Sequence, residues 1–406
     1  MARSAPADLQ QLREAVAEAL AAREPMELVA GGSKRGLGRP LQTPRTLDLS
    51  RLSGIRSYEP NELVLTAAAA TPLERIEQAL ASSRQMLAFE PPDWRRLLGS
   101  GETCPTLGGV LACNFAGPRR LAAGAARDHF LGFCGVNGRG EIFKAGGKVV
   151  KNVTGYDLCK LMAGSYGTLA VLEEVTVKVL PRPETACTVL LHGLDPSAGA
   201  ARLVAALGGP HEVSGAAYLP ADARMPQASP SGPGRAALRL EGPAPSVAFR
   251  RDAVLRELAS GGDAEVLDQE ASAAFWRGVG DADPLCGLAE HAVWRVSLAP
   301  SRGAELAETV ARAAPVRWYL DWGGGLVWLA VAGIEDGGAE RIRRAIRGRD
   351  GSGTGHAMLV KGPPGLRHTV PVLEPQPAAL AALSRRVKDS FDPCHILNPG
   401  RMVAEI

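Results

Sequence analysis

The stretch that decides the fold runs from Lys148 to Pro181 and reads KVVKNVTGYDLCKLMAGSYGTLAVLEEVTVKVLP. It begins as a polar loop, continues as a short apolar helix and turns at Gly164 and Gly167. Residues 168–180 are rich in Val, Leu and Thr, which predicts a buried strand. Prolines follow at 181 and 183. Because proline cannot donate to a strand ladder, we expect the first domain to end near residue 183.

The composition is typical of a folded protein with two or three domains. The chain has 406 residues, 46% of them hydrophobic and 22% charged. Its 46 Lys and Arg against 43 Asp and Glu leave a net charge of +3, without a basic block interleaved with aromatic residues. A nucleic-acid interface is therefore not expected.

The cysteines and the apolar segments indicate a cytoplasmic location. The seven cysteines are scattered, without a C-x-x-C pair that could hold zinc or an iron–sulfur cluster, so we expect no metal site. Residues 7–23 have the spacing of an amphipathic helix rather than of a signal peptide, and no apolar run reaches membrane-spanning length. Any contact with the inner membrane would be peripheral, through a partner subunit.

Upstream of residue 148 the pattern predicts strands at 27–30 and 63–67. A capped helix should start at Thr71, Pro72 and Glu74. Residues 91–140 are glycine-rich and resemble an ordered binding loop. Beyond residue 183 short strands alternate with helices, which predicts a ferredoxin-like duplication with helices on one face of an antiparallel sheet. The predicted strands are 188–191, 236–240, 293–298 and 326–331; the predicted helices are 197–207, 245–259, 302–313, 338–347 and 376–390.

Two glycine motifs are candidate phosphate sites. In residues 31–34, Gly-Gly-Ser-Lys directly follows a strand, so backbone N–H groups could converge on phosphate oxygens. In residues 106–109, Thr-Leu-Gly-Gly could form a second backbone clamp. Neither motif is a P-loop or a G-x-G-x-x-G fingerprint. A tight turn and a structured surface loop remain open as alternatives for the first and second motif, respectively.

Taken together, four segments, 31–34, 106–109, 127–132 and 164–169, resemble the FAD-binding domain of the vanillyl-alcohol oxidase / p-cresol methylhydroxylase (PCMH) flavoproteins. Within that family the chain is similar, along nearly its whole length, to the FAD-binding E subunits of bacterial glycolate oxidases (glycolate dehydrogenases). Segments 58–63, 85–92, 151–157, 178–183, 294–297 and 321–325 carry this likeness.

The resemblance implies an α+β architecture. A two-lobed PCMH-type FAD-binding domain would span 1–183, a ferredoxin-like cap domain 184–374, and a C-terminal helix and tail that returns to the flavin 375–406. FAD would be bound noncovalently, because residues 99–109 contain Cys104 but no histidine, and Cys104 is more simply a loop or buried cysteine.

The resemblance also implies roles for individual residues. One side of the FAD pyrophosphate would be held by Ala30, Gly31, Gly32, Ser33 and Lys34. The other side would be held by Thr106, Leu107, Gly108 and Gly109. Gly167 and the Val171 backbone would lie near the adenine, and Asn398 near the isoalloxazine.

Catalytic residues are harder to find. Related 2-hydroxy-acid dehydrogenases carry a His-x-Gly-Asp-Gly-Asn-x-His run in the cap, and this chain has none. Arg295 is the best anchor for a substrate carboxylate, through bidentate geometry, although a surface salt bridge would explain it equally well. We expect Trp318, Trp322 and Trp328 to be core residues.

The chain offers no route of its own by which electrons could leave a flavin, so a partner is expected. The resemblance implies a complex with a D-type flavoprotein subunit and an iron–sulfur subunit. The leading hypothesis is therefore an FAD-binding subunit of glycolate oxidase, with an assembly or electron-transfer role, while the D-type partner oxidises glycolate to glyoxylate. The alternatives are a self-sufficient FAD-dependent dehydrogenase for a small 2-hydroxy acid such as D-lactate, with a cap-domain histidine as base, and a flavin-free structural subunit.

Overall fold

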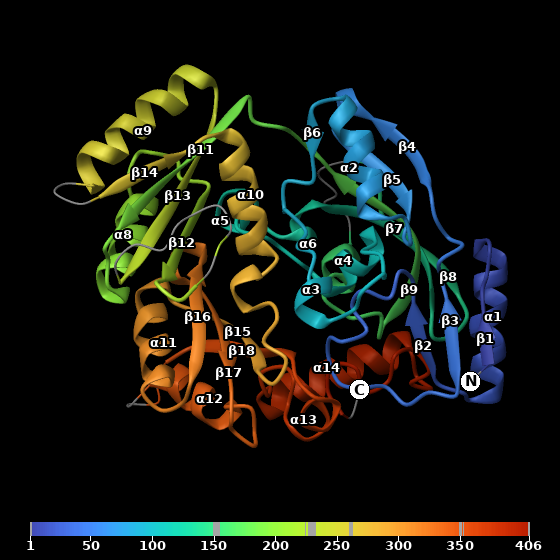
Figure 1. Ribbon diagram of the computed structural model, residues 1–406. Helices are drawn as coiled ribbons and strands as arrows, with labels where there is room; N and C mark the ends of the chain where they lie inside the picture. The colour runs from blue at the N-terminus through green and yellow to red at the C-terminus, as the bar shows by residue number, and fades with distance from the viewer. Residues whose placement is uncertain are drawn as a thin grey trace.

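The chain folds into two lobes joined by a C-terminal segment (Figure 1). The computed structural model describes residues 2–148, 155–223, 225, 233–259, 263–348, 351 and 353–404. The blue and cyan N-terminal lobe lies on one side of Figure 1, the green to orange lobe on the other, and the red C-terminal helices lie below and between them. The part of the opening stretch that covers residues 149–154 lies outside the described residues.

The first part of the N-terminal lobe is a parallel sheet with the order β1-β3-β2, packed on helix α1. Asp8 caps α1 by accepting from the Gln11 N–H, and the apolar face with Leu12, Val16 and Ala19 is buried. This confirms the helix expected from the spacing in 7–23. The bounds are β1 Ala2–Ser4, α1 Leu9–Ala22, β2 Met26–Val29 and β3 Arg45–Asp48.

The second part of this lobe is an antiparallel sheet with the order β4-β5-β9-β7-β8. Its central strand β9 is the strand predicted at 168–180. The bounds of the strands, including the small β6–β10 pair, are β4 Ile55–Glu59, β5 Val64–Ala68, β6 Gln85–Met86, β7 Phe130–Asn137, β8 Ile142–Gly146, β9 Ala170–Lys178 and β10 Leu180–Pro181. The helices are α2 Leu73–Ser82, α3 Arg95–Leu98, α4 Leu107–Cys113, α5 Arg120–Ala123, α6 Ala126–His129 and α7 Leu158–Met162.

Two expectations for this lobe were wrong. Thr71 does not cap α2, which starts at Leu73 without a side-chain cap. Its hydroxyl instead donates to the Ala68 carbonyl at 2.6 Å and accepts from the Gly54 N–H at 2.9 Å, so it stabilises the turn before the helix. The stretch 91–140 is not a loop throughout, because it forms α3 to α6 and β7. Those helices are too short to give a helical apolar period in the sequence.

The second lobe is built on one antiparallel sheet with the order β14-β11-β13-β12-β16-β17-β15-β18. Each half has the element order β-α-β-β-α-β, and the halves meet at the bridge between Tyr218 and Leu320. The strands are β11 Thr185–His192, β12 Gly215–Pro220, β13 Gly234–Gly242, β14 Ala264–Leu267, β15 Ala292–Leu298, β16 Val316–Asp321, β17 Leu326–Val331 and β18 Gly355–Lys361. The helices are α8 Pro196–Gly208, α9 Ala244–Leu258, α10 Gln269–Gly280, α11 Gly303–Ala311 and α12 Ala339–Arg347.

The predicted duplication thus appears with more elements than the pattern indicated. Strands β12, β14, β16 and β18 and helix α10 were not predicted. One face of the sheet packs on α8, α9, α11 and α12 in its own apolar core. The opposite face carries Tyr319 and Trp328, which share a core with the first lobe. The domain boundaries at 183/184 and 374/375 stay a prediction.

The C-terminal segment returns to the first lobe. After α13 Pro364–Thr369 and α14 Ala378–Phe391, Leu397 bridges to Met26 of β2. A fully buried ion pair fixes this return: Lys388 Nζ lies 2.7 Å from Asp392 Oδ2 and also donates to the carbonyls of Thr168 and Leu397. The carboxylate of Asp392 accepts from the N–H groups of residues 396 and 397, so both charges are satisfied inside the protein.

Candidate functional site

The first wall of the candidate site is the turn after β2. Gly32 has a φ of 77°, which favours glycine. Gly31 is required for a different reason from the one we expected: a Cβ there would lie 1.8 Å from the Cys104 carbonyl oxygen. The Cys104 N–H donates to the Gly31 carbonyl at 2.9 Å. Gly31 therefore allows two protein loops to join, rather than opening space for a phosphate.

The second wall is the start of α4. Thr106 is its N-cap and accepts from the Gly109 N–H at 3.3 Å. A Cβ on Gly108 would lie 2.7 Å from the Ala69 side chain, so this glycine serves helix packing. Gly109 faces the other way, because its Cβ would lie 3.7 Å from Lys34 Nζ. Lys34 and Gly109 therefore face each other across the site.

Lys34 is a buried charged group of this site, whose lining also includes Arg35 and Arg401. Its ammonium donates to Ser33 Oγ at 3.2 Å, lies 5.5 Å from the ring centroid of Phe115, and has no ion pair with a carboxylate among the described residues. Burial lowers its pKa. A buried ammonium with spare donors fits an anionic ligand such as a phosphate group, because the ligand would supply the missing acceptors.

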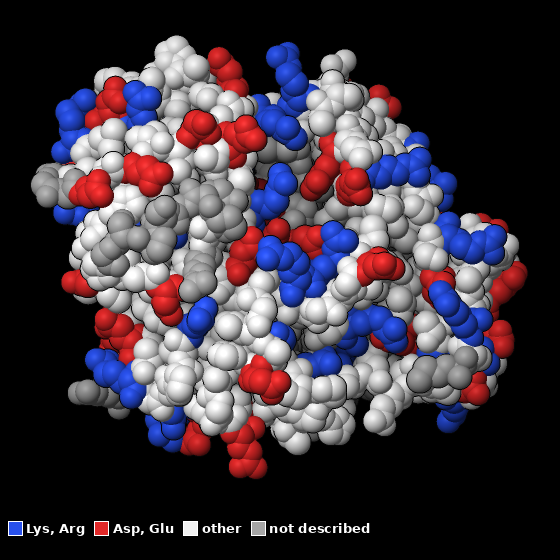
Figure 2. Space-filling model, in the orientation of Figure 1, with Lys and Arg blue, Asp and Glu red and all other residues white. Residues whose placement is uncertain are grey.

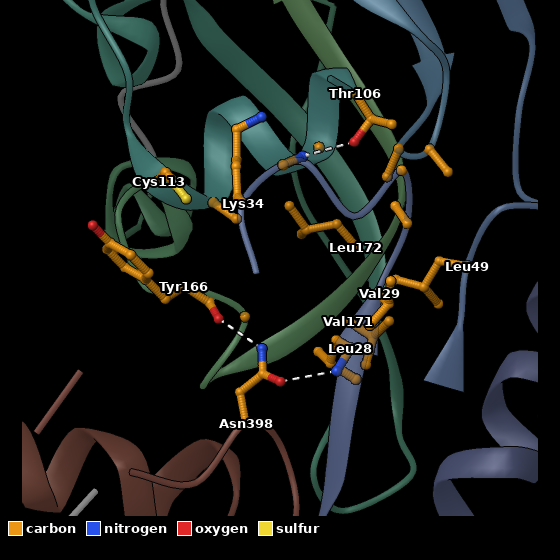
Figure 3. A pocket seen from close by; sticks show the side chains of 18 of the residues that line it. Leu28, Val29, Lys34, Leu49, Thr106, Cys113, Tyr166, Val171, Leu172 and Asn398 are labelled. Carbon is orange, nitrogen blue, oxygen red and sulfur yellow. Dashed lines mark hydrogen bonds between the residues drawn. The ribbon is translucent and has the colours of Figure 1, made fainter. Parts of the chain in front are cut away.

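The third wall joins the C-terminal tail to the turn before β9 (Figure 3). Asn398 Oδ1 accepts from the Leu28 N–H, and Nδ2 donates to the Tyr166 carbonyl, both at 2.8 Å. Gly167 has a φ of 70°, and a Cβ there would lie 2.9 Å from Asn398 Nδ2. Gly167 and Asn398 are thus in contact. They cannot lie at the adenine and isoalloxazine ends of one extended FAD, so the prediction that separated them was wrong.

These walls enclose one pocket, which contains every predicted cofactor residue except Leu107. Its lining includes Ala30, Gly31, Gly32, Ser33, Lys34, Thr106, Gly108, Gly109, Gly167, Val171 and Asn398. Leu107 is fully buried in the core behind α4. The sequence reasoning missed further lining residues, among them Leu28, Leu49, Cys113, Tyr166, Leu172 and Arg401. Arg401 donates to the carbonyls of residues 34 and 35. It lies three residues after Asn398, so the prediction for Asn398 was the signal that could have found it.

Arg295 does not line this pocket but lies beside it, on the face of the cap sheet that meets the first lobe. Its guanidinium lies 4.6 Å from the Trp322 ring centroid, and Arg120 lies 4.7 Å from the same ring. Neither arginine has an ion pair among the described residues. Burial, followed by the charge of Arg120, lowers the pKa of Arg295 to about 10. The two guanidinium groups on one indole, neither of them in an ion pair within the described part of the chain although Asp128 and Asp321 are near enough to act on their pKa values, form a candidate anion site.

Trp322 fixes this arrangement because it connects the two lobes. Its indole Nε1 donates to the Gly117 carbonyl at 3.1 Å, and its own φ is 51°. The carboxylate of Asp321 accepts from the Trp322 N–H at 2.7 Å and holds the turn. Burial raises the pKa of Asp321 to about 7. Trp318, Trp322 and Trp328 are all buried core residues, as expected: Trp322 and Trp328 in the core shared by the two lobes, and Trp318 in the core of the cap.

A second cavity, of about 550 Å³, lies between the lobes; Figure 2 shows a hollow there, with side chains of both charges around it. Arg239 makes a bidentate pair with Glu90, at 2.7 and 3.0 Å, and Arg119 lies 2.9 Å from Glu241. Although burial would raise the pKa of Glu90, Arg239 and Arg119 lower it to about 2. These pairs bind the lobes to each other.

Among the described residues, no group of three His, Cys, Asp or Glu side chains is placed to hold a metal ion. None of the described helices is long and apolar enough to cross a membrane.

Comparisons with known proteins agree with this geometry. A family model described as "FAD binding domain" matches residues 2–146. The chain is 36% identical over 398 residues to glycolate oxidase subunit GlcE of Escherichia coli (strain K12), covering 98% of both chains. It is 42% identical over 102 residues to glycolate oxidase subunit GlcD of Bacillus subtilis (strain 168), covering 25% of this chain and 21% of that one. The solved structure of p-cresol methylhydroxylase with substrate bound covers 99% of this chain and 88% of its own, with a TM-score of 0.68 and 13% identity.

The fold and the pocket are therefore those of an FAD-binding flavoprotein, which confirms the predicted α+β fold class and FAD as the cofactor. Within that class, the chain belongs to the family of glycolate oxidase subunit GlcE.

Proposed function

We propose that this chain is the FAD-binding subunit of a glycolate oxidase complex and takes part in the oxidation of glycolate, and of similar small 2-hydroxy acids, to the 2-oxo acid. The observation that carries this proposal is the match to the E. coli GlcE subunit along 98% of both chains. Ser33, Lys34 and Gly109 would hold the FAD pyrophosphate noncovalently. FAD supplies the acceptor for the two electrons that leave the substrate.

The proposal includes partners. A GlcD-type flavoprotein subunit and an iron–sulfur subunit would take the electrons onward. The likeness to the B. subtilis GlcD subunit over 102 residues supports a complex of related flavoproteins. We propose a cytoplasmic location, with any contact with the inner membrane made through these partners.

A second candidate function is oxidation of the hydroxy acid at this chain's own site, rather than at the D-type partner. The pair of Arg120 and Arg295 on Trp322 favours it, because two guanidinium groups that make no ion pair with the described residues can bind the carboxylate of the substrate. Tyr166 connects this pair to the flavin pocket, because it is one of the residues that line the pocket. Its hydroxyl lies 3.6 Å from Sδ of Met358, and Met358 is the strand partner of Arg295. Arg295 would be the anchor and Arg120 its partner.

One set of experiments tests both candidates. The purified chain should be yellow and release FAD on denaturation, and it should co-purify with a co-expressed GlcD-type subunit. A colourless chain, or failure to co-purify, would contradict the first candidate. Anaerobic glycolate should bleach the flavin of the isolated chain if the second is right. Bleaching in the complex but not in the isolated chain would leave oxidation to the partner.

A further inference from the structure

One histidine of the cap lies beside the arginine pair. In the ladder between β15 and β18, Arg295 pairs with Met358, and Ser297 pairs with His356. Paired residues of an antiparallel ladder share a face, so these four side chains point to the same side of the sheet. The alternate residues Trp294, Val296, Ala357 and Leu359 are buried in the core on the helix-covered side. His356 therefore faces the first lobe.

The distance from His356 to the arginine pair follows from sheet geometry. His356 is the diagonal neighbour of Arg295, and such neighbours lie about 7–8 Å apart. Both side chains are long enough to meet around a small molecule. Met358, two residues along the same strand, contacts the Tyr166 hydroxyl at 3.6 Å, and Tyr166 lines the flavin pocket. His356 therefore lies two residues along β18 from Met358, which contacts a residue that lines the pocket.

The charges around His356 suit a proton acceptor. Burial, then Arg295 on β15 and Arg120 on α5, lower its pKa, while Glu374 in the segment after α13 acts in the opposite direction. The imidazole is therefore neutral near pH 7 and can accept a proton. This burial is partial, because the residue as a whole is still open to solvent, and its side chain makes no hydrogen bond to another residue within the described part of the chain.

We propose that His356 is the base that accepts the hydroxyl proton of a small 2-hydroxy acid whose carboxylate lies between Arg120 and Arg295. This inference rests on the second candidate function. Oxidation to the 2-oxo acid removes two electrons and two protons: the electron pair leaves with the Cα hydrogen to FAD, and the hydroxyl proton remains for the base. His356 would hold that proton on an imidazole nitrogen until it passes to solvent, to which this side chain is open.

Asp321 is the rival base near the same arginines. Its carboxylate is 2% exposed and already accepts from the Trp322 N–H. Asp321 lies on β16 and Arg295 on β15, and β17 lies between these two strands in the sheet. We therefore assign Asp321 to holding Trp322.

The first test does not depend on turnover. Oxalate, which carries a carboxylate and no oxidisable Cα–H, is added to the FAD-loaded chain, and the His356 imidazole C–H signal, assigned by its loss in His356→Gln, is titrated by NMR. The pKa of His356 should rise by about half a unit or more, because the bound anion neutralises the two guanidinium groups. The rise should disappear in Arg295→Gln. An unchanged His356 pKa at saturating oxalate would overturn the proposal.

The second test follows flavin bleaching by glycolate in a stopped-flow instrument. His356→Gln should slow it about 10²- to 10⁴-fold and remove the acid limb of its pH profile, with FAD content and Tm unchanged. The matched control is His368→Gln, an exposed histidine on α13, which should behave like the wild type. Bleaching of His356→Gln at the wild-type rate refutes this assignment but leaves the second candidate intact. A wild-type chain that glycolate does not bleach refutes both.

Discussion

Replacing Lys388 with methionine should destabilise the chain strongly, although the residue lies outside the flavin pocket. The ammonium and its partner Asp392 are both fully buried. Removing one member of a buried pair leaves the other charge uncompensated, which costs about 3–5 kcal/mol. Asp392 keeps two backbone N–H donors, at 3.0 and 2.8 Å, so we expect the lower part of that range.

The assay is thermal unfolding followed by circular dichroism. With an unfolding entropy of about 2.1 cal/mol/K per residue, 3–5 kcal/mol lowers the Tm of a chain of this length by about 4–6 °C. The matched control is Arg344→Met, which breaks the exposed i,i+4 pair between Glu340 and Arg344 and should cost at most about 0.5 kcal/mol. FAD should also bind more weakly to Lys388→Met, because Lys388 holds the Leu397 carbonyl next to Asn398. Equal Tm changes in the two variants would refute the reasoning.

Three other substitutions test the charges of the two cavities. Glu90→Gln should lower the Tm at pH 7 by the equivalent of about 3 kcal/mol, because Arg239 holds the pKa of Glu90 low. The difference in Tm from the wild type should shrink as the pH falls from about 4.5 toward 2. A difference that does not depend on pH would count against this ion pair. Burial raises the pKa of Asp281 to about 7, so the folded state favours the protonated acid. The stability of the wild type therefore falls as the pH rises from about 4 to 7. Asp281→Asn should raise the Tm at pH 8 and change it little at pH 4. Lys34→Met should weaken FAD binding about 10- to 100-fold in a fluorescence titration, as expected for the loss of a charge-assisted hydrogen bond, and unchanged affinity would show that Lys34 does not contact the cofactor.

The sequence was sufficient where a short motif determines its own geometry. The turn at Gly31 depends on a few adjacent residues and was predicted, and the family resemblance implied that it shares a pocket with residues 106–109. The helix cap at Thr106 was not predicted, because residues 91–140 have no helical period. The reason for Gly31 could not be predicted, because the Cys104 carbonyl that requires it is far away in the sequence. The prediction for Gly167 and Asn398 failed for the same reason. Nothing in either segment shows that residues 231 positions apart are in contact.

The cap shows a second limit of sequence reasoning. Strand β12 reads Gly-Ala-Ala-Tyr-Leu-Pro and is buried on both faces, so it lacks the alternation that identifies a strand. The arginine pair on Trp322 was not predicted because α5, β15 and the end of β16 meet only in three dimensions. Lys388 lies in the helix predicted at 376–390, and only the tertiary structure shows that it is buried, because a lysine is rarely buried without a partner.

The contact between Leu28 and Asn398 sets the order in which the cofactor pocket can be built during translation. The two residues are 370 positions apart. At about 5–20 residues per second, a ribosome needs roughly 20–70 s to synthesise the second after the first. Throughout that interval β2 lacks its C-terminal neighbour, and one wall of the pocket does not exist. FAD that needs all three walls can therefore be loaded only after the tail has been synthesised and has docked.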